Sequence, residues 1–187
     1  MKSTVQTSVW LILMMVSALA QAASKPAVSH PIGGGLAVSL PKSWVVKNYP
    51  MPLEGATNLR IEADDVRIAI TGFPTEKGRL DKSALADMLA QSATYYLSKA
   101  KDPQLHAEYF ETESALGAYA VLETASGNEE FAVFPGRYYA CVAPIIISSQ
   151  TMVFSISIGC EEADDDELTA ALNAIRAIGG VAASNQP

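Results

Sequence analysis

Histidine and cysteine are scarce in this 187-residue sequence, which contains two residues of each kind. Cys141 and Cys160 lie too far apart for a Cys-x-x-Cys redox motif, and their spacing matches no zinc-binding pattern. His106 cannot be grouped with His30, which lies in a segment that we expect to be flexible, and a metal site usually needs three or four ligands. We therefore predict no catalytic residues, no metal site and no cofactor.

Other ligand-binding motifs are also missing. The triplet Gly33-Gly34-Gly35 follows no predicted strand, opens no predicted helix and precedes no Lys-Ser/Thr, so we interpret it as a hinge rather than a phosphate loop. The acidic run from Glu161 to Glu167 lacks the alternating oxygen ligands and the central glycine of an EF-hand loop. We predict instead that it begins a helix, with Asp164 and Glu167 as a capping-box-like pair.

The apolar segment at the N-terminus is short for a membrane span. Val9 to Ala20 is a run of 12 residues, whereas a spanning helix needs about 20. The run follows the basic Lys2 and ends in Ala20-Gln21-Ala22, a small-x-small cleavage pattern. We predict that residues 1–22 are a signal peptide for export to the periplasm or for secretion, with an uncleaved membrane anchor as the alternative.

Basic residues are outnumbered in the predicted mature chain, which keeps 165 of the 187 residues. Loss of Lys2 leaves 12 basic and 20 acidic residues, a net charge of −8. Such a surface disfavours nucleic acids and anionic lipids, and it permits a basic protein partner. The length suits one domain. We expect a flexible leader at 23–35, a single domain at 36–180, a tail at 181–187, and no membrane anchor after signal cleavage.

The most regular pattern in the chain lies between Arg137 and Cys160, where we predict two long antiparallel strands. With the turn centred between Gln150 and Thr151, opposed residues have numbers that sum to 301. One face then pairs only apolar residues while the other is mixed, and a slip of one residue would oppose unlike rows. The apolar pairs are Cys141 with Cys160, Ala143 with Ile158, Ile145 with Ile156, and Ile147 with Phe154.

This register places Cys141 directly opposite Cys160. Opposed strand positions have Cα atoms about 4.5–5.5 Å apart, a span that a disulfide can bridge. We predict the disulfide, which fits an oxidising compartment, with two buried thiols as the alternative. Because Gln-Thr lacks the chemistry of a two-residue turn, we expect a four-residue loop, Ser149 to Met152, which would make the cysteines a non-hydrogen-bonded pair.

Shorter patterns predict further strands and two helices. One helix is expected from the Asp81 cap to Lys99, and another up to Ile178, where Gly179-Gly180 ends it. Sequential hairpins imply an α+β domain with a central antiparallel sheet and helices packed against it. The other predicted strands are Leu36 to Leu40, Trp44 to Tyr49, Asn58 to Ala63, Val66 to Phe73, Leu105 to Glu113, Ala118 to Thr124 after a turn at Leu116-Gly117, and Phe131 to Phe134.

The segment Leu40-Pro41-x-x-Trp44, a helix after about two hairpins, the long hairpin and the closing helix together resemble the PsbP/Mog/DcrB superfamily. The resemblance covers Leu36 to Ile178. It implies an α/β/α sandwich and a mostly non-catalytic binding or accessory role for an exported, periplasmic protein. It supplies no site residues, because no family motif for a site can be matched in this chain.

The absence of a catalytic constellation favours a non-catalytic binding or accessory protein that acts through a protein surface. We expect its partner to be another protein, and the sequence leaves the oligomeric state open. An immunity protein that neutralises an envelope-targeted toxin is one alternative. A small-ligand carrier is another, with a pocket lined by Tyr95, Tyr96, Tyr138 or Tyr139.

A hydrolase is the third alternative to a surface-binding role. Its acid–base chemistry would fall to His106 and Glu108, which we expect to project from the same side of one strand. Glu111 is a further candidate, although strand alternation directs it to the opposite face.

Overall fold

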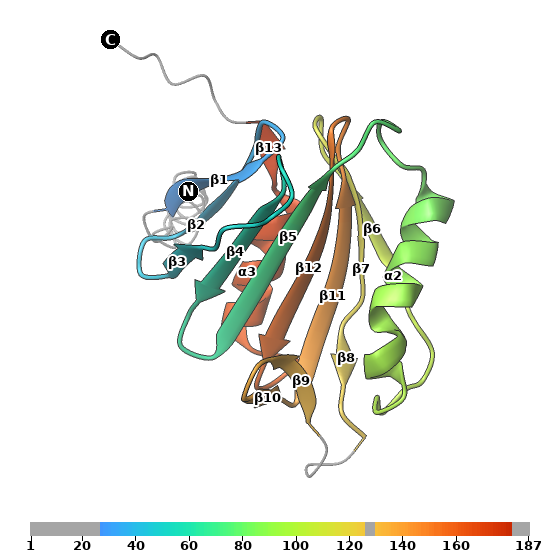
Figure 1. The fold of residues 1–187 in the computed structure, drawn as a ribbon. Coiled ribbons are helices and arrows are strands. Elements are labelled where there is room, and N and C mark those ends of the chain that lie inside the picture. Colours follow the sequence, from blue (N-terminus) through green and yellow to red (C-terminus); the bar gives the residue numbers. More distant parts are fainter. Residues whose placement is uncertain (1–26, 126–129, 181–187) are drawn as a thin grey trace, which may run out of the picture.

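An antiparallel sheet forms the centre of the fold (Figure 1), with strands in the order β3-β4-β5-β12-β11-β7-β6 and the short β8 paired with β11. The computed structural model describes residues 27–125 and 130–180. Within them β1, β2 and β13 form a second sheet, β9 and β10 form a third, and the helices are α2 and α3, so the predicted α+β class is confirmed. The bounds are β1 Ala27–Gly33, β2 Leu36–Pro41, β3 Val45–Asn48, β4 Thr57–Glu62, β5 Val66–Pro74, α2 Lys82–Leu97, β6 Glu108–Glu111, β7 Leu116–Tyr119, β8 Leu122–Glu123, β9 Phe131–Phe134, β10 Arg137–Tyr139, β11 Cys141–Ser148, β12 Met152–Cys160, α3 Asp166–Arg176 and β13 Gly179–Gly180.

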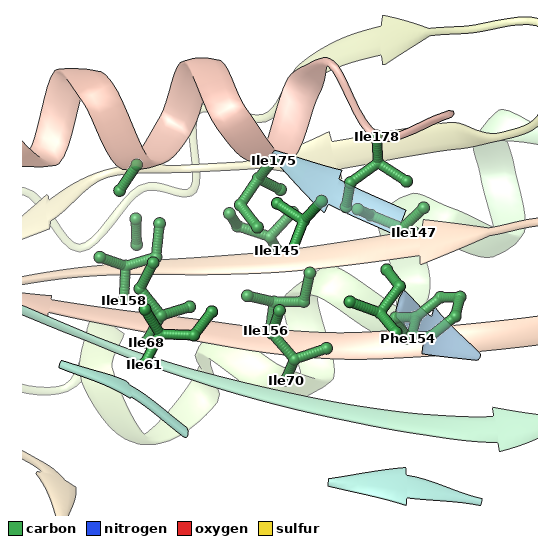
Figure 2. Close-up of a cluster of buried hydrophobic side chains, with 14 of the residues drawn as sticks. Ile61, Ile68, Ile70, Ile145, Ile147, Phe154, Ile156, Ile158, Ile175 and Ile178 are labelled. Atoms are coloured by element: carbon green, nitrogen blue, oxygen red, sulfur yellow. The ribbon is translucent and has the colours of Figure 1, made fainter. Parts of the chain in front are cut away.

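One face of the central sheet is buried beneath α3 and the β1-β2 sheet. Alternate side chains of β4, β5, β11 and β12 point to this face. Figure 2 shows their isoleucines meeting Ile175 of α3 and Ile178, which follows the helix. Helix α3 ends at Arg176, before the predicted end at Ile178, and Gly179-Gly180, predicted to end the helix, pairs instead with β2 as β13. Full burial of such a side chain contributes about 1.5–3 kcal/mol, so this layer is a major source of stability.

The opposite face is covered over only part of its width. Helix α2 packs on β11 and β7, where Leu85 and Leu89 join Ala118 and Ile146 in an apolar cluster. The β9-β10 hairpin packs on β12 and β11. In the described part of the chain no helix lies over β4 and β5 on this face, as Figure 1 shows, and their side chains here are half-exposed.

The long hairpin has the register that its sequence predicts. Its ladder runs from Cys141 opposite Cys160 to Ser148 opposite Val153. The predicted start at Arg137 is wrong, because Arg137–Tyr139 forms β10 and pairs with β9 instead. Strand β12 ends at Cys160, so residues before Cys141 have no opposed strand in this ladder.

The turn of this hairpin is tighter than expected. The Ser149 N–H donates to the Met152 carbonyl at 2.9 Å, which leaves only Gln150 and Thr151 between the paired residues. The Ser149 hydroxyl oxygen accepts hydrogen bonds from the Met152 N–H at 3.0 Å and the Thr151 N–H at 3.3 Å. A serine side chain therefore stabilises a turn that lacks Asn-Gly chemistry, and the predicted four-residue loop is wrong.

Cys141 and Cys160 form the predicted disulfide, and their Cα atoms lie 5.0 Å apart. Hydrogen-bonded pairs recur at every second position of an antiparallel ladder. Because Ser149 and Met152 are such a pair, the cysteines occupy a hydrogen-bonded pair too, not the non-hydrogen-bonded pair that we expected. Both cysteines are buried, and a bridge that closes about 20 residues contributes roughly 3 kcal/mol.

The predicted flexible leader at 23–35 is wrong for residues 27–33, which form β1 and pair with β2. This segment is held because Ile32 is fully buried in the main core and its carbonyl accepts a hydrogen bond from the Thr57 hydroxyl at 2.8 Å. Gly33-Gly34-Gly35 forms the turn between the two strands, with φ values of 106°, 60° and 74° that favour glycine. The predicted signal peptide 1–22, residues 23–26 and the tail 181–187 lie outside the described residues.

The turn predicted at Leu116-Gly117 lies earlier in the chain, between β6 and β7. The Thr112 N–H donates to the Ala115 carbonyl at 2.9 Å, and the Thr112 hydroxyl accepts from the Ala115 N–H at 3.1 Å. These bonds close the reversal before Leu116 is reached. Gly117 instead lies within β7, opposite Phe110.

Both helices begin with an aspartate cap. Asp81 Oδ1 accepts the backbone N–H three residues further on at 2.9 Å, as predicted for α2. The cap of α3 is Asp165 rather than the predicted Asp164, and its carboxylate accepts the Glu167 N–H at 2.6 Å. Glu167 does not complete a capping box, because its own carboxylate accepts the Asp65 N–H at 2.9 Å and ties α3 to the β4-β5 turn.

Candidate functional site

A cavity of about 360 Å³ opens beside the uncovered strands β4 and β5, and we call it the arginine cavity. Three of the protein's five arginines line it, although the chain as a whole is acidic. Its size falls in the range of small-ligand sites. The lining residues are Tyr49, Asn58, Arg60, Ile61, Glu62, Arg67, Phe134, Pro135 and Arg137.

The β4-β5 hairpin and the distant turn between β9 and β10 bring these side chains together. Strand alternation on β4 buries Leu59 and Ile61 and leaves Arg60 half-exposed on the other face. Arg67 projects from the neighbouring β5. The tight turn between β9 and β10, with Gly136 at a φ of 71°, presents Arg137 from a third direction.

Two of the cavity's three arginines, Arg60 and Arg67, are held by groups that leave their positive charge unneutralised. The Arg60 guanidinium lies 5.2 Å from the Phe134 ring centroid, a cation–π contact. Arg67 Nη1 donates to the backbone carbonyls of Val66 at 2.9 Å and Asp64 at 3.3 Å, and also to that of Ala63. Among the described residues, none of the ion pairs includes an arginine of the cavity.

The single carboxylate of the cavity is already engaged. Lys47 Nζ of the edge strand β3 lies 3.1 Å from both carboxylate oxygens of Glu62. This hydrogen bond, together with the charges of Lys47, Arg67 and Arg137, lowers the pKa of Glu62 below its ordinary value. Three guanidinium groups and one carboxylate give the lining a formal charge of +2.

Two buried polar atoms near this site lack a hydrogen-bond partner in the described residues. One is Oδ1 of Asn58, which lines the cavity. The other is the hydroxyl of Tyr139, a residue only 6% exposed, whose ring packs against Phe134 with centroids 6.0 Å apart. Burial raises the pKa of Tyr139, while the charges of Arg67 and Arg137 act in the opposite direction. A buried group without a partner is unfavourable, so a ligand or water that supplies one would be stabilised here.

The structure does not assemble the acid–base residues of the hydrolase alternative. His106 precedes β6 and lies 3.0 Å from Asp102, so it does not share a strand face with Glu108. The pKa of Asp102 is lowered mainly by a hydrogen bond from the backbone N–H of Gln104, with a smaller contribution from the hydrogen bond with His106. Glu108 accepts a hydrogen bond from the Tyr119 hydroxyl at 2.5 Å. Burial is the main cause that raises the pKa of Tyr119, and this hydrogen bond raises it further.

Glu111, the third residue of that alternative, forms an ion pair with Arg79. The three residues therefore take part in three separate contacts, each with a different partner. Among the described residues, no hydrogen bond or ion pair joins any two of these three side chains.

The four tyrosines of the ligand-carrier alternative do not line the arginine cavity. Tyr95 and Tyr138 are 50% and 61% exposed. Tyr96 packs edge-on against Phe131 with ring centroids 5.5 Å apart, and burial raises its pKa. Tyr139 packs against Gly159 and Phe134 and is not among the lining residues.

The acidic run at the start of α3 lines a second hollow of about 500 Å³ together with Asp65. Within the described ranges, no group of three or more His, Cys, Asp or Glu side chains is placed to hold a metal ion. The acidic side chains have a structural role where their contacts are defined, as Asp165 and Glu167 show.

The arginine cavity was missed because no short motif encodes it. The available signal was the polar row Asn58, Arg60 and Glu62 on a strand whose alternate residues are core. A polar row of this kind is typical of any half-exposed strand. The contribution of Arg137 depends on how the β9-β10 hairpin packs on the large sheet, which its own sequence does not specify.

The fold and the site define an α+β protein with a cationic cavity beside a partly uncovered sheet. Comparison with known protein families finds no match, and no curated protein matches the chain. Among solved structures, the chain is similar to a crystal structure of a protein from Bacteroides thetaiotaomicron VPI-5482 at 1.50 Å resolution, with 15% sequence identity and a TM-score of 0.47. The match covers 84% of this chain and 49% of that one, so this chain spans about half the length of that protein. No helix among the described residues is both long and apolar enough to cross a membrane.

Proposed function

We propose that this chain is an exported, periplasmic, non-catalytic binding or accessory protein that acts through a protein surface. The surface is the uncovered face of β4 and β5, with the arginine cavity beside it. The observation that carries the proposal is the gathering of three arginines, none in an ion pair among the described residues, in a protein of net charge −7. Such an arrangement is unfavourable by self-repulsion unless something compensates it, which is typical of a binding site.

The disulfide supports the cellular location in this proposal. Buried disulfides are typical of proteins in oxidising compartments outside the cytoplasm and are rare inside it. The N-terminal pattern of Lys2, a 12-residue apolar run and a small-x-small site is the sequence counterpart of that location. The periplasm is the compartment that we propose.

The resemblance to the PsbP/Mog/DcrB superfamily and its α/β/α sandwich is part of the same proposal. Its support is the packing of α2 on one face of the central sheet and of α3 on the other. The small sheet that contains β1 and β2 packs beside α3. It is an addition to the helix, sheet and helix layers of a three-layer sandwich.

Capture of partners from an envelope extract by the mature protein tests the proposed function. Ala69 lies on the uncovered face of β5, and the variant Ala69→Arg should abolish capture of a specific partner by steric block. Asn173→Arg, on the exposed side of α3, is the matched control and should capture that partner as the wild type does. Capture that is equal in both variants, or no capture by the wild type under several conditions, would contradict the proposal.

A further inference from the structure

We infer that the arginine cavity binds a compact oxyanion with two negative charges, such as a phosphoryl group or a pair of carboxylates. The inference rests on the proposed function, because it names the ligand of the same site. The chemistry follows from the lining, whose formal charge of +2 a dianion would neutralise. Arginine is the side chain whose planar fork of donors fits carboxylate and phosphate oxygens in pairs.

Two of the three guanidinium groups are positioned before any ligand arrives. Arg60 rests on the Phe134 ring, and Arg67 is held by backbone carbonyls at the β4-β5 turn. Neither contact neutralises the cation, so the charge remains available to a ligand. Fixed side chains also lose less conformational freedom on binding, which favours affinity.

The remaining carboxylate of the cavity is hydrogen-bonded to a lysine rather than to an arginine. Glu62 has its two oxygens within 3.1 Å of Lys47, which lies on the adjacent strand β3. Lys47 therefore compensates the negative charge at the rim. An incoming anion would meet the three arginines with reduced repulsion from Glu62.

An alternative ligand, a cation, is excluded by the same charges. The acidic hollow beside α3 differs in this respect, because it holds carboxylates and no basic residue. The linings of the two hollows thus have charges of opposite sign. Of the two, only the arginine cavity has a charge opposite to the net charge of the protein. An anion is drawn to it in spite of the surrounding acidic surface, so binding should depend strongly on these few side chains.

Titration of the full-length or mature protein with inorganic phosphate and with succinate, at constant ionic strength set by sodium chloride, tests the inference. The readout is the NMR shift of the arginine Nε–Hε resonances. We expect saturable shifts at Arg60, Arg67 and Arg137. Arg176, on the opposite face of the sheet over the Tyr119 ring, serves as the internal control and should not shift. A stronger response to phosphate would identify a phosphoryl ligand, and a stronger response to succinate would identify paired carboxylates.

Two substitutions make the test specific. Arg137→Gln removes a side chain exposed at a turn and should weaken binding roughly tenfold, as loss of one charged hydrogen bond predicts. Arg67→Gln should weaken it at least as much, although its backbone contacts also support the fold. Arg176→Gln is the matched variant outside the cavity and should bind as the wild type does.

The inference is overturned if no saturable shift is seen with either anion, or if Arg137→Gln binds as the wild type does. Equal shifts at Arg176 and at the cavity arginines would also overturn it, because they indicate screening of the whole surface. These outcomes are distinct from failure of the proposed function. If Ala69→Arg loses partner capture but the wild type binds no anion, the proposed function stands and the anion inference fails. If the wild type binds an anion but captures no protein partner, the anion inference stands and the proposed function fails.

Discussion

The two faces of the central sheet are built from the same strands but differ in what they carry. On β12, Ile156 and Ile158 are at most 1% exposed beneath α3, whereas Ser155 and Ser157, which alternate with them, are half-exposed on the other face. On β5, Ile68 is fully buried while its neighbour Arg67 reaches the arginine cavity. One face is therefore committed to stability, and the other is free to carry charge and a binding site.

The largest expected effect is on the buried face. Phe154→Ala should lower the free energy of unfolding by about 3–5 kcal/mol, because it removes a fully buried ring from the main core. Ser155→Ala, one residue further on and on the other face, should change it by less than about 0.5 kcal/mol. Urea unfolding of both variants measures the contrast, and similar losses would mean that the two faces do not differ as described.

The disulfide should be the next largest contributor. Replacing Cys141 and Cys160 together by alanine should lower the free energy of unfolding by roughly 3 kcal/mol, since the unfolded chain regains the freedom of a loop of about 20 residues. Chemical denaturation of the variant and the wild type measures the difference. A thiol assay on the unfolded, unreduced wild type is the control and should detect no free thiol. Two free thiols there would contradict the bridge.

A smaller effect is expected where β7 and β6 meet. The Phe110 ring lies over Gly117 so closely that an added Cβ would overlap it. Gly117→Ala should therefore destabilise the protein by about 1–3 kcal/mol through overpacking. Phe110→Ala combined with Gly117→Ala should lose less than the sum of the two single variants, because the overlap is gone. Additive losses in thermal or urea unfolding would show that the close contact is absent.

The smallest effect concerns Glu62 at the rim of the arginine cavity. Its folded-state pKa is lowered from 4.5, mainly by the Lys47 hydrogen bond, so its stabilising contribution is present above that value and lost as the pH falls through the folded-state pKa. Lys47→Met should raise the pKa of Glu62, as measured by NMR titration of the carboxylate carbon. Lys42→Met, at an exposed lysine in the turn before β3, should leave the titration unchanged. An unshifted Glu62 in Lys47→Met would contradict this contact.

Local patterns predicted those parts of the fold that depend on neighbouring residues. The alternation from Cys141 to Cys160 predicted the register and the disulfide, and Asp81 was placed correctly as a helix cap. Prediction went wrong where a side chain replaced the expected turn chemistry, as at Ser149 and Thr112. It also went wrong for residues 27–33, where the Pro-Gly composition was given more weight than the single buried Ile32.

The sequence by itself determined the pairing of β11 with β12, because a slip of one residue would oppose the uniformly apolar row of one strand to the mixed row of the other. Only the tertiary structure decided that Arg60, Arg67 and Arg137 share a cavity. Arg60 and Arg67 share the local β4-β5 hairpin, but Arg137 reaches them through the packing of the β9-β10 hairpin on the central sheet, and such long-range packing leaves no periodic signal along the chain.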